Sequence, residues 1–255
     1  MSCLVFAIRT VPDIDGGRRL YGLEGIADDD VATAMSTLRY QHTDGLTDVL
    51  PHHLQRVVAI AILEQRQGEL DCCVLGDCDP PEAGLIGDFF SRMERHEATL
   101  ISWNGSGFAL PVLNYRALLH GISAPRYWDT GEEDHSFRWN NYLKRFHWRH
   151  TDLMDALSGF NHAAVASLDD IARLLGFPGR SGGHTGDVWE RYRSGQIAAL
   201  GDDCQVDVLN TYVVYLRFQL LRGQLTDHAH GRECARLRAW LGESPREHLQ
   251  AFLRA

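Results

Sequence analysis

The hydrophobic and polar positions at the start of the chain predict a buried strand. Residues 4–8 are apolar without interruption, and such a short continuous run is typical of a strand buried on both faces of a sheet. Pro12 cannot donate a hydrogen bond to a neighbouring strand, so the strand is expected to end near it. We therefore expect residues 3–12 to lie in the middle of a sheet.

Three further apolar runs predict additional strands. Residues 56–65 and 70–75 flank a Gly-Glu turn, so we expect them to pair as a hairpin beside the first strand. Residues 98–103 form the fourth predicted strand. Strands that come early and are followed by helices fit an α/β fold, with a mixed sheet of about five strands and helices on both faces.

Apolar side chains on one face predict a helix over residues 80–96, where Leu85, Phe89 and Met93 are four apart. Ser167 has the character of an N-cap for a helix over residues 168–175. Helices are also expected over residues 31–39 (capped by Asp28, Asp29 or Asp30), 111–120, 187–194, 196–223 and, as one or two segments interrupted at Gly242, 232–255.

Glycine, proline and polar residues mark the expected loops. Residues 13–25 are predicted to form a loop, with a small hairpin about Gly16 and Gly17. A tight loop is expected at residues 104–107, an irregular segment at 124–150 with a short helix near 141–146, and a mobile loop at 176–186.

Composition and charge limit the class of protein. The 255 residues are 44% hydrophobic and 23% charged, which is typical of a globular protein. The longest apolar run, residues 57–63, is too short to cross a bilayer. No secretory signal is recognisable, so a cytoplasmic location and no membrane partner are expected. With a net charge of −9, any nucleic-acid binding must depend on a local basic region.

The metal-binding residue types do not form a diagnostic motif. The six cysteines include no Cys-x-x-Cys pair, so buried or incidental thiols are expected. Three histidine pairs, at residues 52–53, 147 and 150, and 228 and 230, have no third ligand at a suitable spacing. The most cationic stretch, residues 137–150, interleaves aromatic side chains with Arg and Lys. This pattern suits single-stranded nucleic acid, although any compact fold also needs aromatic side chains in its core.

Three stretches of the chain resemble the motifs of one nuclease family. They are CLVFAIRTVPD at residues 3–13, WNGSGFALP at 103–111 and DCQVDVLNTY at 203–212. They are similar to the motifs F-D-I-E-T, N-G-x-x-F-D-L-P and Y-x-x-x-D of predicted 3′–5′ exonucleases related to the exonuclease domain of DNA polymerase B, which are DnaQ-like DEDD nucleases. The resemblance implies a ribonuclease H-like fold, with an exonuclease-like domain over residues 1–225 and a helical C-terminal extension over 226–255.

Active relatives hold Mg²⁺ or Mn²⁺ between four carboxylates, and the resemblance shows where those groups fall in this chain. The aspartate and glutamate of the first motif fall at Ala7 and Arg9, and the aspartate of the second falls at Ala109. The tyrosine of the third motif falls at Asp203, and its aspartate is kept as Asp207. We therefore expect no metal and no cofactor, because Mg²⁺ needs several oxygen ligands.

The resemblance also implies a substrate cleft, formed by Arg9, Thr10, Asn104, Gly105 and Phe108. Arg9 has two possible roles, since it can pair with Asp207 or Asp203 in the former metal position, or contact a phosphate directly. Asp203 and Asp207 are four residues apart and can in principle share a cation on one helical face.

Three functions remain open from the sequence. The leading hypothesis is a degenerate, catalytically inactive exonuclease-like protein that keeps a cleft for single-stranded nucleic acid or a nucleotide. The second is an active metal-dependent 3′–5′ exonuclease, or an inactivated variant of one. The third is a protein-interaction scaffold with a protein partner and no nucleic acid.

Overall fold

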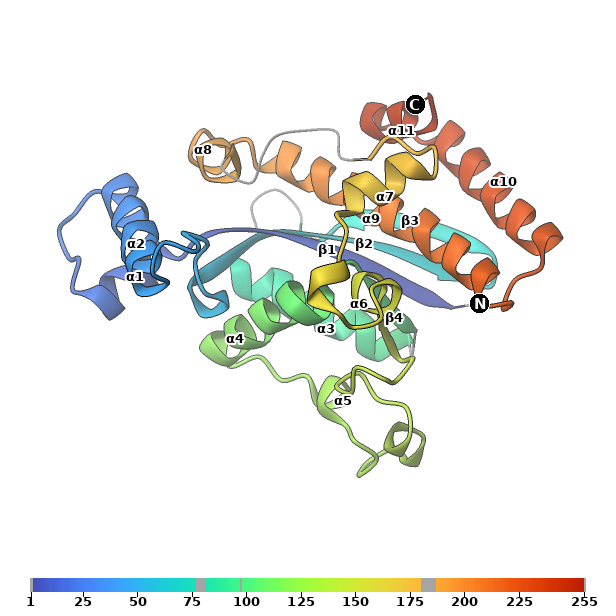
Figure 1. Cartoon of the computed structure of the whole chain (residues 1–255), viewed down its shortest axis with the longest axis horizontal. Helices are drawn as coiled ribbons and strands as arrows, with labels where there is room; N and C mark the ends of the chain where they lie inside the picture. The colour runs from blue at the N-terminus through green and yellow to red at the C-terminus, as the bar shows by residue number, and fades with distance from the viewer. Residues whose placement is uncertain (1, 77–80, 97, 180–186, 255) are drawn as a thin grey trace.

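A mixed β-sheet runs through the middle of the molecule, between two layers of helices (Figure 1). The computed structural model describes residues 2–76, 81–96, 98–179 and 187–254. Its strands are β1 (Cys3–Pro12), β2 (Gln55–Arg66), β3 (Glu69–Val74), β4 (Thr99–Ser102) and β5 (His150–Asp152). Within the described residues their order is β3-β2-β1-β4-β5. This confirms the predicted α/β architecture, which is that of a ribonuclease H-like fold.

Strand β1 is the central strand, as its apolar run predicts. It pairs antiparallel with β2 and parallel with β4, and β2 and β3 form the predicted hairpin. Alternate side chains of β1 enter the two layers: Phe6 packs with α3 (Glu82–His96) and α4 (Leu110–His120), whereas Val5 packs with α9 (Ile197–Leu221). The buried run therefore reflects a strand covered on both faces.

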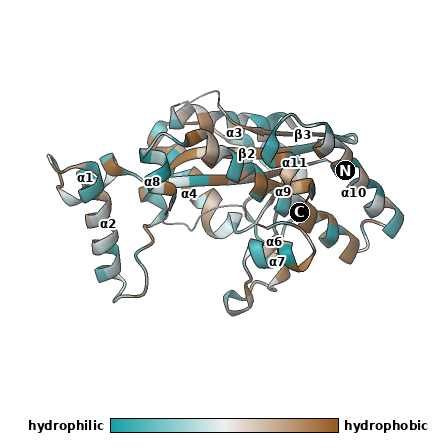
Figure 2. Cartoon of the chain, turned by 90° about the horizontal axis from the view of Figure 1, so that it is seen from above, coloured by the Kyte–Doolittle hydropathy of each residue, from teal (hydrophilic) through white to brown (hydrophobic). Residues whose placement is uncertain are grey.

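The long helix α9 is the core of one layer. Most of its side chains are buried, and Figure 2 shows hydrophobic colouring concentrated along the sheet and α9, whereas α1 and α2 are mostly hydrophilic. The elements around α9 are α6 (Leu153–Leu157), η4 (His162–Ala164), α7 (Leu168–Leu174), α8 (Asp187–Arg193), α10 (Asp227–Glu243) and α11 (Glu247–Arg254). Ser167 caps α7 as predicted, since its Oγ accepts the backbone N–H of Asp170 at 3.0 Å.

The two C-terminal helices pack onto α9. Leu237 and Leu241 of α10, and Leu249 and Phe252 of α11, belong to the same hydrophobic cluster as α9. The predicted interruption at Gly242 is wrong, because α10 continues through Gly242 to Glu243. The break lies at residues 244–246, where a proline follows Ser244. A residue that precedes proline is disfavoured in the helical conformation, whereas one glycine costs a helix only about 1 kcal/mol.

The loop and hairpin predicted over residues 13–25 are wrong. The helix α1 (Ile14–Tyr21) stands there and packs against α2 (Asp28–His42). A Cβ atom on Gly17 would lie 2.3 Å from the sulfur of Met35, so this glycine permits close helix packing rather than a turn. Helix α2 begins at Asp28, and the predicted aspartate cap is wrong because Ala27 is the N-cap. The aspartates lie in the first turn, where their negative charges interact favourably with the positive end of the helix dipole.

Two connecting segments also differ from the prediction. Residues 105–109 form a π-helical turn, η2 (Gly105–Ala109), that continues into α4, instead of an isolated tight loop. Residues 141–146 are not helical, and the short helices of this segment are α5 (Pro125–Trp128) and η3 (His135–Arg138). A further short helix, η1 (His52–Leu54), precedes β2. Most of the loop predicted at 176–186 lies outside the described residues.

No helix in the described part of the chain is both long enough and apolar enough to cross a membrane.

Candidate functional site

A cleft of about 340 Å³ lies where β1, β4, η2 and α9 meet. It brings together most of the positions that the sequence selected, although they come from distant parts of the chain. Those lining the cleft are Ala7, Arg9, Asn104, Phe108, Ala109 and Asp207. The fold therefore gathers the three motifs around one cavity.

Arg9 and Asp207 form an ion pair in this cleft. The Nη1 atom of Arg9 lies 2.8 Å from Oδ2 of Asp207, and their side chains are only 13% and 6% exposed. Arg9 lies on the same face of β1 as Val5, which packs against α9. Its side chain therefore reaches Asp207 on α9. Burial alone would lower the pKa of Arg9, but nearby acidic groups, including Asp207 and Asp203, raise it. Arg9 therefore carries a positive charge at any ordinary pH.

Asp203 lies one helical turn before Asp207 but has a different partner. Its Oδ2 lies 2.6 Å from Nη1 of Arg191, on α8. Asp203 and Asp207 are thus each paired with a different arginine. Of the two ion pairs considered for Arg9, the structure has the one with Asp207. No group of three or more His, Cys, Asp or Glu side chains within the described ranges is arranged to hold a metal ion.

Thr10 and Gly105 do not line the cleft in the described structure. Thr10 follows an irregularity of β1 after Arg9, and its hydroxyl donates to Oε1 of Gln55 on β2 at 2.8 Å. Gly105 is buried beneath the cleft, where a Cβ atom would lie 2.1 Å from Oγ of Ser102. Both residues therefore support the walls of the cleft.

Asp152 positions the loop that carries Asn104, and the sequence analysis missed this role. Its carboxylate accepts the backbone N–H groups of Asn104 at 2.9 Å, Ser106 at 2.8 Å and Met154 at 3.1 Å. Asp152 can do so because it ends β5, which pairs with β4 next to the loop. The available signal was an aspartate directly before an apolar helix start, in the sequence Thr-Asp-Leu-Met.

We expect Asp152→Ala to lower the free energy of unfolding by about 2 kcal/mol, since hydrogen bonds to a buried carboxylate contribute about 1.5–3 kcal/mol. Urea unfolding followed by circular dichroism measures the change. The control is Asn161→Ala, which removes one exposed cap of η4, the 3.0 Å bond to the Ala163 amide. A loss for Asp152→Ala no larger than for the control would contradict the anchoring role.

His150 and Ser102 form a buried contact below the same loop. Ser102 Oγ and His150 Nε2 are hydrogen-bonded at 2.8 Å, and the two residues are 1% and 7% exposed. Burial lowers the pKa of His150 to about 4, although Asp155 acts in the opposite direction. The imidazole is therefore neutral at pH 7.

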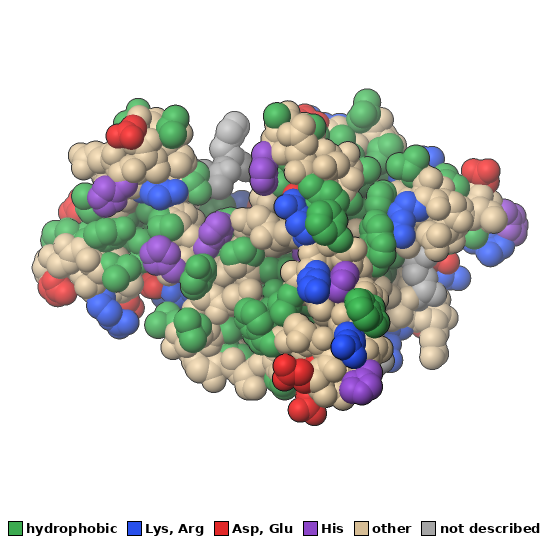
Figure 3. Space-filling view, turned by 60° about the horizontal axis from the view of Figure 1, so that its bottom comes forward, with side chains coloured by type: hydrophobic (Ala, Val, Ile, Leu, Met, Phe, Trp, Pro, Cys, Tyr) green, Lys and Arg blue, Asp and Glu red, His purple; other side chains and the backbone are tan. Residues whose placement is uncertain are grey.

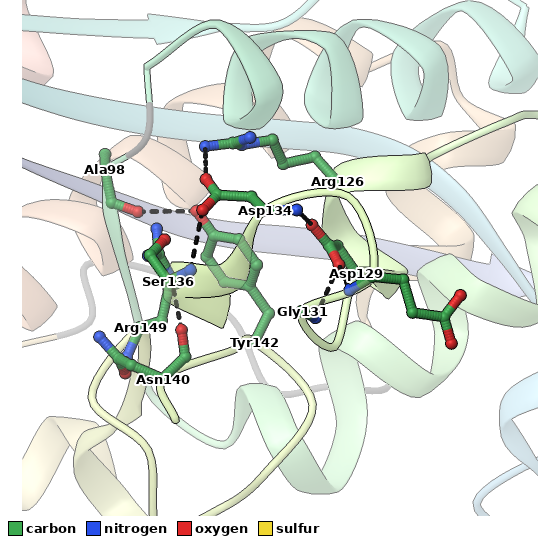
Figure 4. A network of polar contacts seen from close by, with 10 residues as sticks. Ala98, Arg126, Asp129, Gly131, Asp134, Ser136, Asn140, Tyr142 and Arg149 are labelled. Atoms are coloured by element: carbon green, nitrogen blue, oxygen red, sulfur yellow. Dashed lines mark hydrogen bonds and ion pairs between the residues drawn. The ribbon is translucent and has the colours of Figure 1, made fainter. Parts of the chain in front are cut away.

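The irregular segment at residues 124–150 is held by polar contacts rather than by regular structure (Figure 4). Asp129 accepts the backbone amides of Gly131 at 2.8 Å and Asp134 at 3.0 Å. Tyr142 donates to the carbonyl of Ala98 on the edge of β4 at 3.1 Å. Such side-chain bonds to the backbone replace the ladders of helices and strands.

This segment divides its aromatic side chains between core and surface. Phe137 and Tyr142 are buried, whereas Trp139, Phe146 and Trp148 are 80%, 72% and 48% exposed. Some aromatic side chains of the cationic stretch therefore fill the core, and others are accessible to a ligand.

The histidine pairs are used in separate local contacts. His147 Nδ1 accepts the backbone N–H of Asn141 at 2.9 Å, so it does not join His150. His52 packs against Phe108 with ring centroids 5.7 Å apart and the ring planes tilted by 56°. Four cysteines in the described part of the chain are free thiols: Cys3, Cys72, Cys73 and Cys234.

One family model matches this chain. It is described as a predicted 3′–5′ exonuclease related to the exonuclease domain of PolB, and it matches residues 47–255. The match contains the second and third motifs and the helices α10 and α11, and it leaves out residues 3–13. No curated protein matches the chain.

Proposed function

Because the chain belongs to the family of predicted 3′–5′ exonucleases related to the exonuclease domain of DNA polymerase B, we propose that it binds single-stranded nucleic acid without cleaving it. The proposed binding site is the cleft around Arg9 and Asp207, and binding needs no divalent cation. The ion pair between these two residues is the observation that carries the proposal.

The residues of the cleft do not fit a two-metal centre. Such a centre needs several carboxylates around the ions, whereas Ala7 and Ala109 offer only methyl groups and Asp203 is paired with Arg191 outside the cleft. Two carboxylates do line the cleft in the described structure, and each has an arginine partner: Asp207 with Arg9 at 2.8 Å and Asp169 with Arg173 at 3.0 Å. A divalent cation 4 Å from the charge of Arg9 would be repelled by about 8 kcal/mol at an effective dielectric constant of 20. An arginine in this position therefore disfavours binding of the divalent cation that catalysis requires.

The same arginine is suited to bind the phosphate of a nucleic acid. A guanidinium has five N–H donors and binds phosphate in a planar, bidentate geometry. Within the described residues, both contacts of Arg9 use the Nη1 atom, one to Asp207 and one to the carbonyl of Ile8 at 3.3 Å. The Nε–H and Nη2–H groups of Arg9, which neither of these contacts uses, can donate to a phosphate in the cleft.

We expect a 3′-labelled single-stranded oligonucleotide to bind equally well with Mg²⁺ and with EDTA. Fluorescence anisotropy at 50 and 200 mM salt measures the affinity, which should fall about 20-fold if some three phosphates are neutralised. Digestion of the oligonucleotide with Mg²⁺ or Mn²⁺ would overturn the proposal and support the active nuclease.

Substitutions of the two residues of the ion pair should have opposite effects on the affinity for the oligonucleotide. Arg9→Gln removes the phosphate ligand and should weaken binding about 10-fold, since a hydrogen bond between charged groups contributes about 1.5–3 kcal/mol. Asp207→Asn removes the competing negative charge and should strengthen binding several-fold. Arg95→Gln, an exposed change on α3 across the sheet, is the control. If both variants weaken binding alike, the effect is structural and Arg9 is not a phosphate ligand.

A further inference from the structure

A second cavity, of about 290 Å³, lies beside the cleft. Its wall combines four aromatic rings with two guanidinium groups. They are Phe146, Trp148, Phe160, Phe218, Arg145 and Arg222. We call this cavity the aromatic pocket.

The rings and cations of the aromatic pocket are fixed by contacts with one another. The guanidinium carbon of Arg222 lies 3.7 Å from the ring centre of Trp148, and that of Arg145 lies 4.7 Å from the ring centre of Phe160. Phe146 and Phe160 meet edge to face, with centroids 5.0 Å apart. Such cation–π and ring contacts hold aromatic faces in place before a ligand arrives.

Two of these rings, Phe146 and Trp148, are not needed to fill the core, whereas Phe218 belongs to the core around α9. Phe146 is 72% exposed and Trp148 is 48% exposed, and exposed aromatic clusters mark binding surfaces. Leaving large rings in water is unfavourable, so a ligand that covers them gains the hydrophobic free energy of their burial.

The wall of the aromatic pocket carries both signs of charge, because Asp152 and Asp155 line it beside the two arginines and Oδ2 of Asp155 lies 3.7 Å from Nη2 of Arg145. The segment that supplies much of this wall is nevertheless cationic, although the whole chain is acidic. Residues 135–150 contain Arg138, Lys144, Arg145 and Arg149 and no Asp or Glu, in a chain of net charge −9. Figure 3 shows one face of the molecule on which basic, hydrophobic and histidine side chains are interspersed, with acidic side chains at the lower end. A ligand that is both aromatic and anionic therefore matches the face in chemistry and in charge.

The aromatic pocket and the cleft share one wall. Asn104 lines the cleft and Ser106 lines the aromatic pocket. The carboxylate of Asp152 binds the backbone amides of both residues, at 2.9 and 2.8 Å. Two residues of chain span at most about 7 Å, so the two cavities are close enough for successive nucleotides of one strand.

We propose that the aromatic pocket is a stacking subsite for one nucleobase of a single strand whose phosphate lies in the cleft. The base stacks on the exposed rings of Phe146 and Trp148, and Arg145 and Arg222 face the adjoining phosphates. This subsite rests on the proposed function. It adds a contact that stacks on the face of a nucleobase and so accepts any base.

The test compares a normal oligonucleotide with a series in which a single abasic residue is moved along the strand. In the unmodified protein, one abasic position should weaken binding about 5- to 50-fold, as expected for the loss of one stacked base. In Phe146→Ala and in Trp148→Ala this penalty should shrink to less than about 2-fold. Trp139→Ala is the control, since Trp139 is 80% exposed on the same segment and does not line the aromatic pocket.

The outcomes separate this subsite from the proposed function. Equal penalties in the unmodified protein and in both pocket variants, with binding still sensitive to Arg9→Gln, overturn the subsite alone. The absence of any binding at 50 mM salt overturns the proposed function and the subsite with it. A penalty that also disappears in Trp139→Ala would place the stacking elsewhere on the segment and overturn the subsite.

Discussion

Arg116→Met should lower the free energy of unfolding by about 3–5 kcal/mol, the typical loss when one partner of a buried charge cluster is removed. Arg116 lies on α4 and is 3% exposed. It forms ion pairs with Asp13, which follows β1, and with Glu82, which begins α3. The variant would leave two carboxylates buried without their cation.

The cluster is held together by several polar contacts. The Oε1 atom of Glu82 accepts the Nε–H of Arg116 at 2.8 Å and the backbone N–H of Val57 at 2.6 Å. Its Oε2 atom also contacts His120 Nε2 at 2.8 Å. Burial alone would lower the pKa of Arg116, but the hydrogen bonds that it donates to Glu82 and Asp13 raise it. The network joins β2, α3, α4 and the residue after β1 through two carboxylates around one guanidinium.

Urea unfolding of the Arg116→Met protein measures this prediction. Arg95→Met is the matched control, because Arg95 is 61% exposed and its nitrogen lies 3.8 Å from Asp88. Exposed pairs of this kind contribute about 0–1 kcal/mol. A similar loss in both variants would show that the buried cluster contributes no more than a surface ion pair.

Acidification from pH 6.5 to pH 4 should cost the protein about 3 kcal/mol of stability through His150 alone. Its pKa is about 4 in the folded protein, against about 6.5 in an unfolded chain. Between these values the unfolded chain binds more protons, so stability falls as the pH falls. The contribution is complete above pH 6.5 and is lost progressively down to pH 4.

The physical cause is that protonated His150 would be a buried cation. It is 7% exposed and hydrogen-bonded to the hydroxyl of Ser102. Asp155 favours the protonated form but does not overcome burial. Because His150 lies under the loop of Gly105, its protonation should also loosen the wall between the cleft and the aromatic pocket.

The measurement is the free energy of unfolding as a function of pH for the unmodified protein and for His150→Gln. The glutamine can keep a hydrogen bond with Ser102 but does not titrate. The curve of the variant should be flatter between pH 4 and 6.5 by about 3 kcal/mol, while other titrating groups affect both proteins alike. Parallel curves would show that His150 is not protonated on unfolding in this range.

Local patterns in the sequence were sufficient for the central strand, the β2–β3 hairpin and the main helices. The run at residues 4–8 is apolar at every position, as is typical of a strand covered on both faces. Ser167 and the apolar spacing in α3 likewise act within one turn of their element. The motifs also selected six side chains that the fold brings to one cleft.

Elements whose stability comes from distant contacts escaped the sequence analysis. Strand β5 has only three residues, and its place is set by pairing with β4. The helix α1 contains two glycines, and it forms where Gly17 packs against Met35 of α2. The irregular course of the segment at 124–150 was predicted, but the bonds that hold it, such as that between Tyr142 and Ala98, were not. None of these leaves a periodic signal.

The sequence by itself determined which chemical groups stand at the positions selected for the cleft, with methyl groups at Ala7 and Ala109 and a guanidinium at Arg9. The tertiary structure alone decided how the remaining charges pair. Asp203 and Asp207 are equally available to Arg9 by sequence, but Asp203 meets Arg191 from α8 and Asp207 meets Arg9 from β1. Pairing of this kind depends on distances between elements that are far apart in the chain, and such distances exist only once the sheet and α9 have packed together.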